Sequence, residues 1–188
     1  MKKIIIQELN SHLFAANQLS KLSTVIETSA KLCIDCINNN GKVLIFGNGG
    51  SAADAQHFAA ELVGRFKNSR KGLPAVALTT DSSALTSIGN DFGFKYVFQR
   101  QIEALANKGD VVIGISTSGQ SKNVNSALKL ASILGCETIG LSGEDAGEMI
   151  NICNLTLAMP SFDTPRIQEL HIIVIHIICH LIDQKFQE

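Results

Sequence analysis

The chain has 188 residues, of which 45% are hydrophobic and 18% charged, and this composition excludes a disordered chain and predicts one globular domain. The formal net charge is -1 with no long basic block, which argues against a broad nucleic-acid-binding surface. Polar residues directly after Ile6 argue against a signal peptide, and no uninterrupted apolar run reaches membrane-spanning length. The 5 cysteines then indicate free thiols in a reducing cytosol, so we expect a cytoplasmic protein without membrane or nucleic-acid partners.

The first predicted element is a helix over residues 4–38, straight or bent. Apolar residues recur there at intervals of three and four, and the run 38–41, Asn-Asn-Asn-Gly, ends the pattern. This helix precedes the first predicted strand and has no strand partner beside it in sequence, so one of its faces is free to pack on another subunit. We therefore expect residues 1–40 to be a helical oligomerisation segment.

A strand, a glycine-rich turn and a helix are predicted next. Residues 42–46 form an apolar run typical of a buried parallel strand, and the three glycines within 47–50 permit a tight turn. Ser51 is the expected N-cap of a helix over 52–61. The N–H groups and the dipole of such a helix N-terminus attract an anion, most simply phosphate; the alternative is an ordinary strand–helix turn.

His57 and Glu61 are four residues apart on this helix and therefore share one face. That spacing suits two ligands of one metal ion, or a catalytic base and its neighbour. The alternative is a solvated His–Glu pair. We favour a functional pair because the predicted anion site lies within about three helical turns of it.

A basic stretch, residues 65–74, follows the helix. We expect a surface loop whose charged side chains are mostly solvated, although extra positive charge near a phosphate is the functional option. The charged residues of this loop are Arg65, Lys67, Arg70 and Lys71.

The rest of the chain alternates strands with helices, which predicts an α/β fold: a doubly wound, mostly parallel, five-stranded sheet flanked by helices. No linker interrupts the pattern, so we assign residues 1–188 to one domain. The remaining strands are expected at 75–78, 111–115, 137–141 and 155–159, and the helices at 81–89, 97–106, 122–134 and 166–185.

A hydroxyl-rich loop, residues 116–121, closes one of these strands and opens a helix. Hydroxyls and N–H groups at a helix N-terminus bind phosphate without needing a lysine, so this loop is a second candidate anion cradle. The alternative is a serine-rich capping loop. Because both loops follow strands of one parallel sheet, we expect them at its carboxyl edge, where such sheets bind ligands.

The final predicted helix carries Gln168 and three histidines at positions 171, 176 and 180. A lone histidine on an apolar helix is usually a satisfied core residue. Gln168 and His176 are separated by about 80° and about 12 Å of helix rise, so one site can hold both only with a distorted helix or with residues from two subunits. From spacing alone, we do not choose among the histidines. The broad apolar girth of this helix also predicts oligomer packing.

Five segments together match one known family: Gly47–Ser51, His57–Glu61, Gly89–Phe94, Gly114–Gly119, and Arg166–His171 with His176. They resemble the phosphoheptose isomerases, which are sugar-isomerase (SIS) domain proteins. The resemblance covers essentially the whole chain. It implies conversion of sedoheptulose 7-phosphate to D-glycero-D-manno-heptose 7-phosphate, the first step towards the heptose of bacterial surface polysaccharide. It also implies a cytoplasmic homotetramer with one Zn2+ per subunit.

The resemblance also implies roles for individual residues. Glu61 and His176 would be the catalytic acid/base pair, and because the family's sites form between subunits, we expect two protomers to bring them together. Some relatives have Asp where this chain has Pro165, with Asp163 nearby. The implied metal ligands are His57, Glu61, Gln168 and His176. The implied substrate contacts are Asn48, Gly49, Gly50, Glu61, Asn90, Asp91, Ser116, Thr117, Ser118, Ser121 and Gln168.

Two other functions fit parts of the pattern. A non-catalytic SIS protein that binds a protein partner, of the type associated with the bacterial replication initiator, shares the glycine turn and the long first helix. In those relatives the positions of Glu61 and His176 hold other residues, so both residues here favour the enzyme. A sensor or an isomerase of another phosphosugar is the third option, and the lack of an appended regulatory domain weighs against a sensor.

Overall fold

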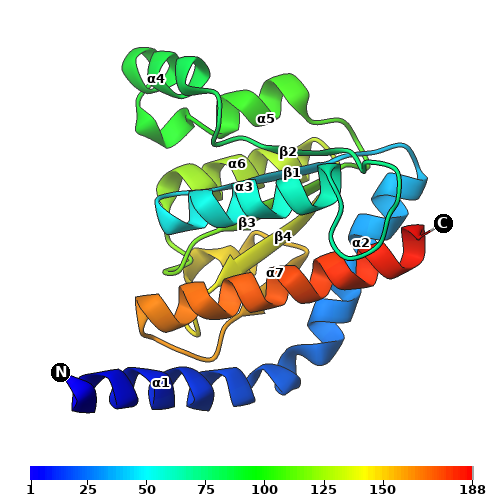
Figure 1. The fold of residues 1–188 in the computed structure, drawn as a ribbon. Coiled ribbons are helices and arrows are strands. Elements are labelled where there is room, and N and C mark those ends of the chain that lie inside the picture. The colour runs from blue at the N-terminus through cyan, green and yellow to red at the C-terminus, as the bar shows by residue number, and fades with distance from the viewer. Residues whose placement is uncertain (188) are drawn as a thin grey trace.

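Five parallel strands form one sheet with the order β2-β1-β3-β4-β5 (Figure 1). The computed structural model describes residues 1–187. Every neighbouring pair of strands is parallel, which confirms the predicted doubly wound α/β sheet. The strands are β1 Val43–Gly47, β2 Ala75–Ala77, β3 Val111–Ile115, β4 Glu137–Ser142 and β5 Leu155–Ala158.

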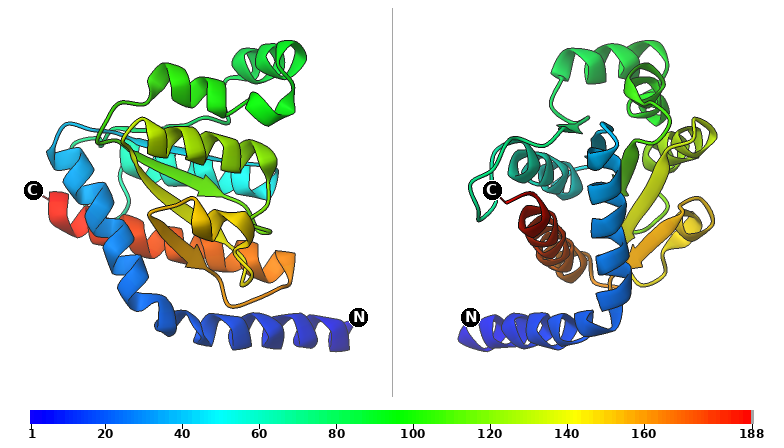
Figure 2. Two further views of the ribbon diagram at one scale, coloured as in Figure 1. Left: turned by 180° about the vertical axis from the view of Figure 1, so that it is seen from behind. Right: turned by 90° about the vertical axis from the view of Figure 1, so that its right-hand side faces the viewer.

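Helices cover both faces of the sheet, and each face has its own apolar core. Helices α2, α3 and α7 pack on one face, and α5 and α6 on the other, as the two views of Figure 2 show. The α-helices are α1 Lys2–Asn17, α2 Ser23–Asn38, α3 Gly50–Val63, α4 Ser82–Asp91, α5 Gln99–Leu105, α6 Lys122–Ile133 and α7 Thr164–Phe186. Within residues 1–187 there are also three short 3-10 helices: η1 Leu19–Leu22, η2 Phe94–Tyr96 and η3 Gly147–Asn151.

The strands are buried on both sides, which explains their nearly continuous apolar sequence. Ile45 and Ile113 belong to the core under α2, α3 and α7, whereas Leu44 and Val112 belong to the core under α5 and α6. Neighbouring residues of one strand point to opposite faces, so each strand contributes to both cores. The sheet is therefore a rigid platform for the loops at its carboxyl edge.

The N-terminal segment is not one uninterrupted helix. Helix α1 ends at Asn17, η1 follows, and α2 begins at Ser23. Leu19 in η1 is only 7% exposed, so its burial fixes the point where the chain turns. Helix α2 then packs on α7 in the core, while α1 lies along the lower edge of the molecule (Figure 1).

Helix α1 is held to the start of α7 by polar contacts. The Arg166 guanidinium donates to the carbonyl and the carboxylate of Glu8, at 2.7 and 3.1 Å. It also donates to Glu169, whose carboxylate lies 2.7 Å from the ring of His12. Arg166 and Glu169 flank Gln168, so these contacts fix the part of α7 nearest the carboxyl edge of the sheet.

Helix α7 is long enough, and over one stretch apolar enough, to cross a membrane by length and composition. This differs from the sequence expectation, which counted only uninterrupted apolar runs. Of the most apolar stretch of α7, 50% is buried inside the fold, where Ile175 and Ile178 pack in the core. The hydropathy of α7 is therefore that of a core helix.

Candidate active site

The two candidate anion loops follow neighbouring strands. The glycine turn follows β1 and the hydroxyl-rich loop follows β3, and these strands pair along five residues, from Val43 with Val111 to Gly47 with Ile115. The chain leaves β1 towards β2 on one side, and β3 continues towards β4 on the other. The loops therefore meet at the point where the direction of winding reverses, where open α/β sheets bind ligands.

Two contacts join these loops to each other and to α7. The side-chain amides of Asn48 and Asn123 donate to each other, at 2.9 and 2.8 Å. Gly50 lies so close to Gln168 that a Cβ on Gly50 would be 2.5 Å from the amide nitrogen of Gln168. Glycine at position 50 thus lets α7 approach the start of α3.

Helix α3 begins two residues earlier than predicted. Its N-cap is Gly49 at φ 55°, and Ser51 lies inside the first turn, 4% exposed. The expectation that Ser51 caps the helix is therefore wrong, because a glycine with a positive φ turns the chain before the serine is reached. The start of α3 still follows β1 at the carboxyl edge of the sheet, but the N–H groups of Ser51 and Ala52 already donate to the carbonyl oxygens of Asn48 and Gly49.

Three side chains on α3 and α7 form a compact cluster. The Nε2 atom of His57 lies 3.0 Å from a carboxylate oxygen of Glu61 and 3.3 Å from Nε2 of His176. One ligand atom from each of the three residues lies within 4.8 Å of the others. Helices α3 and α7 pack side by side and direct these side chains towards one point.

The donor set of this cluster fits a zinc ion. Two imidazole nitrogens and one carboxylate oxygen are the ligands of many catalytic zinc sites, which leave a further position open. Glu61 is partly buried, with a side chain 23% exposed, whereas the side chain of His57 is 45% exposed. The cluster is therefore open to solvent on the side of His57.

The structure corrects the expectation that two protomers are needed to bring Glu61 and His176 together. A single chain does so, because α7 runs beside α3 on the same face of the sheet. Gln168 lies eight residues before His176, about 12 Å back along the helix, and contacts the glycine turn. Its role as a metal ligand stays a prediction.

The other two histidines of α7 have different surroundings. His171 is fully buried, its ring lies 3.1 Å from the carbonyl oxygen of Ser142, and burial lowers its pKa to about 4. His171 is therefore a neutral core residue. His180 lies one turn after His176, and Phe66 packs against both rings, with centroid separations of 5.6 Å to His176 and 6.3 Å to His180.

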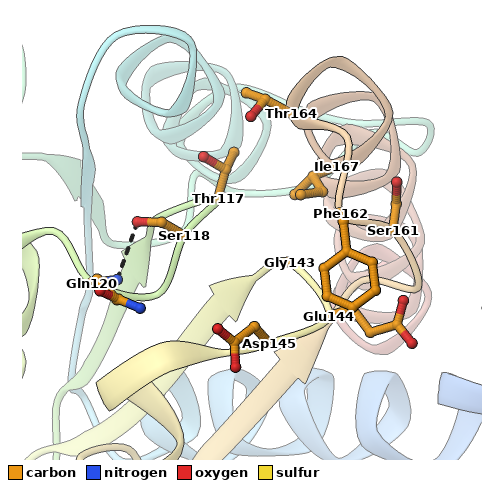
Figure 3. Close-up of a pocket in the computed structure, with 10 residues that line it drawn as sticks. All are labelled: Thr117, Ser118, Gln120, Gly143, Glu144, Asp145, Ser161, Phe162, Thr164 and Ile167. Atoms are coloured by element: carbon orange, nitrogen blue, oxygen red, sulfur yellow. Dashed lines mark hydrogen bonds between the residues drawn. The ribbon is translucent and has the colours of Figure 1, made fainter.

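The hydroxyl-rich loop borders a cavity of about 210 Å³ at the carboxyl edge (Figure 3). Thr117 and Ser118 lie on one side of it and Glu144 and Asp145 on another, so a phosphate would be stabilised only on the hydroxyl side. The buried hydroxyl of Ser116 does not line this cavity. It lies 2.9 Å from the hydroxyl of Ser121 and 3.4 Å from that of Ser118, and so positions the loop.

The predicted contacts Asn90 and Asp91 lie apart from the other candidates. Both are exposed at the end of α4, and the amide of Asn90 donates to Asp91 at 2.8 Å. Figure 1 places α4 on the far side of α3 from α7. The following loop does approach the glycine turn, because Phe94 and Asn48 line the same cavity of about 170 Å³.

The basic loop contains one residue that is not solvated. The side chains of Arg70 and Asp183 are 1% and 0% exposed and form an ion pair of 2.9 Å. The expectation of a mostly solvated loop therefore fails for Arg70. Spacing gave no signal for this pair, because its members are 113 residues apart.

Asp54, which lies on α3 one turn before His57, was not predicted as a site residue from the sequence. One of its carboxylate oxygens is buried without a hydrogen-bond partner. Burial raises its pKa to about 6, and the nearby His57 opposes the shift. The sequence signal for Asp54 is that it is an acidic residue three positions before the candidate ligand His57.

Comparison with known proteins identifies the class. The SIS domain model matches residues 11–143, more than half of the chain. The chain is therefore a SIS-domain protein.

A phosphoheptose isomerase from Helicobacter hepaticus is 55% identical over 188 residues, covering 100% of this chain and 96% of the relative. One from Aliarcobacter butzleri is 55% identical over 186 residues, covering 98% of each. The chain therefore belongs to the phosphoheptose isomerase family.

Solved structures agree with this assignment. A phosphoheptose isomerase from Neisseria gonorrhoeae is 44% identical with a TM-score of 0.92, covering 97% of this chain and 98% of that one. One from Francisella tularensis is 37% identical with a TM-score of 0.94, covering 97% of both chains. A sugar isomerase domain of a transcription factor from Sphaerobacter thermophilus, at 18% identity and a TM-score of 0.68, shares the fold alone.

Proposed function

We propose that this isomerase converts sedoheptulose 7-phosphate to D-glycero-D-manno-heptose 7-phosphate. The family assignment supports an aldose–ketose isomerase. The observation that carries the mechanism is the cluster of Glu61, His57 and His176, which puts a carboxylate and an imidazole beside one small space. A non-catalytic, partner-binding SIS protein is not favoured, because it would have no need for a carboxylate and imidazoles placed to transfer protons.

The reaction moves a carbonyl from C2 to C1 by proton transfer. Glu61 takes a proton from C1, the electron pair forms the C1–C2 double bond of a cis-enediol, and the C2 oxygen is protonated. The proton then returns to C2 as the C1 oxygen loses its own and becomes the carbonyl. His176 is the group that serves the two oxygens. A positioned acid or base of this kind contributes about 10²–10⁴-fold for each proton transfer.

His57, Glu61 and His176 are the residues that would hold Zn2+, and the family resemblance adds Gln168 as a fourth ligand. A bound zinc ion would polarise the substrate carbonyl. The residues of the chain orient the sugar and move its protons. Because Glu61 is both a candidate ligand and the candidate base, metal affinity and catalysis need to be measured separately.

The hydroxyl-rich loop is the proposed phosphate site. Thr117 and Ser118 border the cavity at the carboxyl edge, at the start of α6, where N–H groups and hydroxyls favour an anion. Asn48, which is hydrogen-bonded to Asn123 of α6, links this site to the glycine turn. From Gly50 to His57, α3 rises about 10 Å, so the sugar has to extend from this edge towards the cluster.

A partner subunit is proposed to complete the pocket in a homotetramer. Helix α1 exposes apolar side chains, with Leu9 at 54% and Leu13 at 58%, and Ile177 of α7 is 40% exposed close to His176. Contact with other copies would bury these surfaces. The proposed setting is the cytoplasm, where the product would enter heptose synthesis for surface polysaccharide.

Incubating the purified protein with sedoheptulose 7-phosphate, with and without a zinc chelator, tests the substrate directly. Proton NMR should show the anomeric signals of the aldose product, and other ketose phosphates should react more slowly. Absence of product with zinc-loaded protein would contradict the proposed reaction.

A further inference from the structure

The buried pair of Arg70 and Asp183 ties together the two elements that carry the cluster. Asp183 lies on α7, and its carboxylate accepts hydrogen bonds from the backbone N–H groups of Lys67 and Asn68, at 3.1 and 2.7 Å, and from Arg70 at 2.9 Å. The loop after α3 is thereby fixed to α7. Both charged side chains are removed from solvent, so neither finds a substitute partner in water.

The Arg70 guanidinium also contacts the residue proposed as the base. It donates to the carbonyl oxygens of Glu61, at 2.8 Å, and Leu62, at 2.9 Å. These carbonyls belong to the last turn of α3, where they have no intrahelical partner. Arg70 therefore bridges the backbone carbonyl of Glu61 on α3 and the carboxylate of Asp183 on α7.

Asp183 and His176 lie on the same face of α7. They are seven residues apart, which is close to two full helical turns and about 10 Å of rise. The face of α7 that receives Arg70 is thus the face that presents His176 to His57. A shift of α3 against α7 would change both contacts together.

Phe66 connects the ion pair to the imidazole of His176. It directly precedes Lys67 and Asn68, whose N–H groups bind Asp183. Its ring packs 5.6 Å from the His176 ring, centroid to centroid. Anchoring of the loop by Asp183 therefore holds an aromatic side chain against the candidate catalytic imidazole.

We propose that the Arg70–Asp183 ion pair is a positioning device for the active site, which fixes the backbone of Glu61 and the ring of His176 relative to each other. Its catalytic part rests on the proposed function. Neither residue touches the cluster atoms, so both act through Glu61, Phe66 and His176.

Two conservative variants test the proposal. Arg70→Lys keeps a positive charge, but one ammonium group cannot reproduce the guanidinium's planar set of bonds to Glu61, Leu62 and Asp183. Asp183→Asn keeps the volume and removes the charge. Lys42→Met is the control, because it breaks the Lys42–Asp110 ion pair, which is 2.6 Å long and has a buried aspartate. Lys42 directly precedes β1, at the edge of the sheet opposite the candidate loops.

Two measurements are made on folded protein well below the unfolding temperature. We expect kcat for sedoheptulose 7-phosphate to fall about 10-fold in Arg70→Lys and Asp183→Asn, with KM within about 2-fold, because misplacing reacting groups slows the chemical step. The imidazole signals of His57 and His176 in ¹H–¹⁵N NMR spectra of metal-free protein should shift in both variants. Neither readout should change in Lys42→Met.

The outcomes separate this proposal from the proposed function. Wild-type kcat in both folded variants, unchanged imidazole signals, or equal effects in Lys42→Met would each overturn the positioning role. If wild-type protein does not convert the sugar phosphate, the substrate assignment fails, and the NMR signals alone then decide whether the ion pair positions the cluster.

Discussion

The Nε2 atoms of His57 and His176 lie 3.3 Å apart, although 119 residues separate them in the chain. At this distance the N–H of one ring donates a hydrogen bond to the other ring, or both rings direct lone pairs at a shared cation. The carboxylate of Glu61, 3.0 Å from His57, favours positive charge at the same point. The close approach of His57, His176 and Glu61 within one protomer is therefore the arrangement that a cation site requires.

Removal of His57 should weaken zinc binding without unfolding the protein. The side chain is 45% exposed, so His57→Ala loses few buried contacts. Loss of a direct ligand should lower zinc affinity by more than about 100-fold, since even outer-shell changes cost 10–100-fold. Competition with a chromophoric chelator measures this. Gln56→Ala, at the exposed neighbouring position of α3, is the control and should bind zinc like the wild type.

Breaking the buried ion pair should lower the free energy of unfolding. Arg70→Met leaves the Asp183 carboxylate buried and unpaired, which costs about 3–5 kcal/mol. The double variant Arg70→Met with Asp183→Leu should recover part of this loss, because no charge is left buried. Urea unfolding measures both variants. A single variant as stable as the wild type would show that the pair is not structurally important.

The same aspartate predicts acid sensitivity. Burial alone would raise the pKa of Asp183, but hydrogen bonds from the Asn68 and Lys67 amides and the contact with Arg70 outweigh it, so the pKa lies below its ordinary value. Its stabilising contribution is therefore present above the unfolded pKa of about 3.9 and is lost as pH falls through the lower folded pKa. Asp183→Asn should reduce the unfolding free energy at pH 7 and change its slope below about pH 4. Parallel slopes for wild type and variant would refute this.

The fold was largely predictable because its signals are local. Apolar runs followed by glycine- or serine-rich turns indicated five strands and placed both loops at one edge of the sheet, and the pairing of β1 with β3 agrees. A bend in the helix over residues 4–38 was left open, but its position at Leu19 was not predicted, because the apolar period continues through it. Only burial of Leu19 shows where the chain turns.

Spacing predicted only part of the candidate site, because it did not choose among the histidines of α7. His57 and Glu61 share a helix face by spacing, but the approach of His176 depends on how α7 packs on α3, which no local pattern records. The same is true of Arg70 and Asp183, which look like ordinary surface charges in sequence and are fully buried as a pair. Long-range pairing between helices is the information that the sequence pattern lacked.

Gly119 should be sensitive to substitution. It has φ 64°, and a Cβ there would clash with the carbonyl oxygen of Ala146. Gly119→Ala should therefore displace the hydroxyl-rich loop and raise KM for the sugar phosphate about 10-fold, at a strain cost of about 1–3 kcal/mol. Gly109→Ala has a similar backbone at φ 88° with open space around it, and it should show only the strain. Equal KM values for the two variants would contradict a role of this loop in phosphate binding.

The role of Glu61 as the base is the central claim, and Glu61→Gln tests it most directly. The variant keeps the size of the side chain and removes its ability to take a proton from C1. Conversion of sedoheptulose 7-phosphate should be followed by NMR in D₂O, at matched protein concentration and after circular dichroism confirms the fold. We expect no detectable aldose with the variant, and no deuterium at C2 of the product or at C1 of the remaining ketose, against conversion to equilibrium by the wild type. Conversion by folded Glu61→Gln at the wild-type rate would contradict the account.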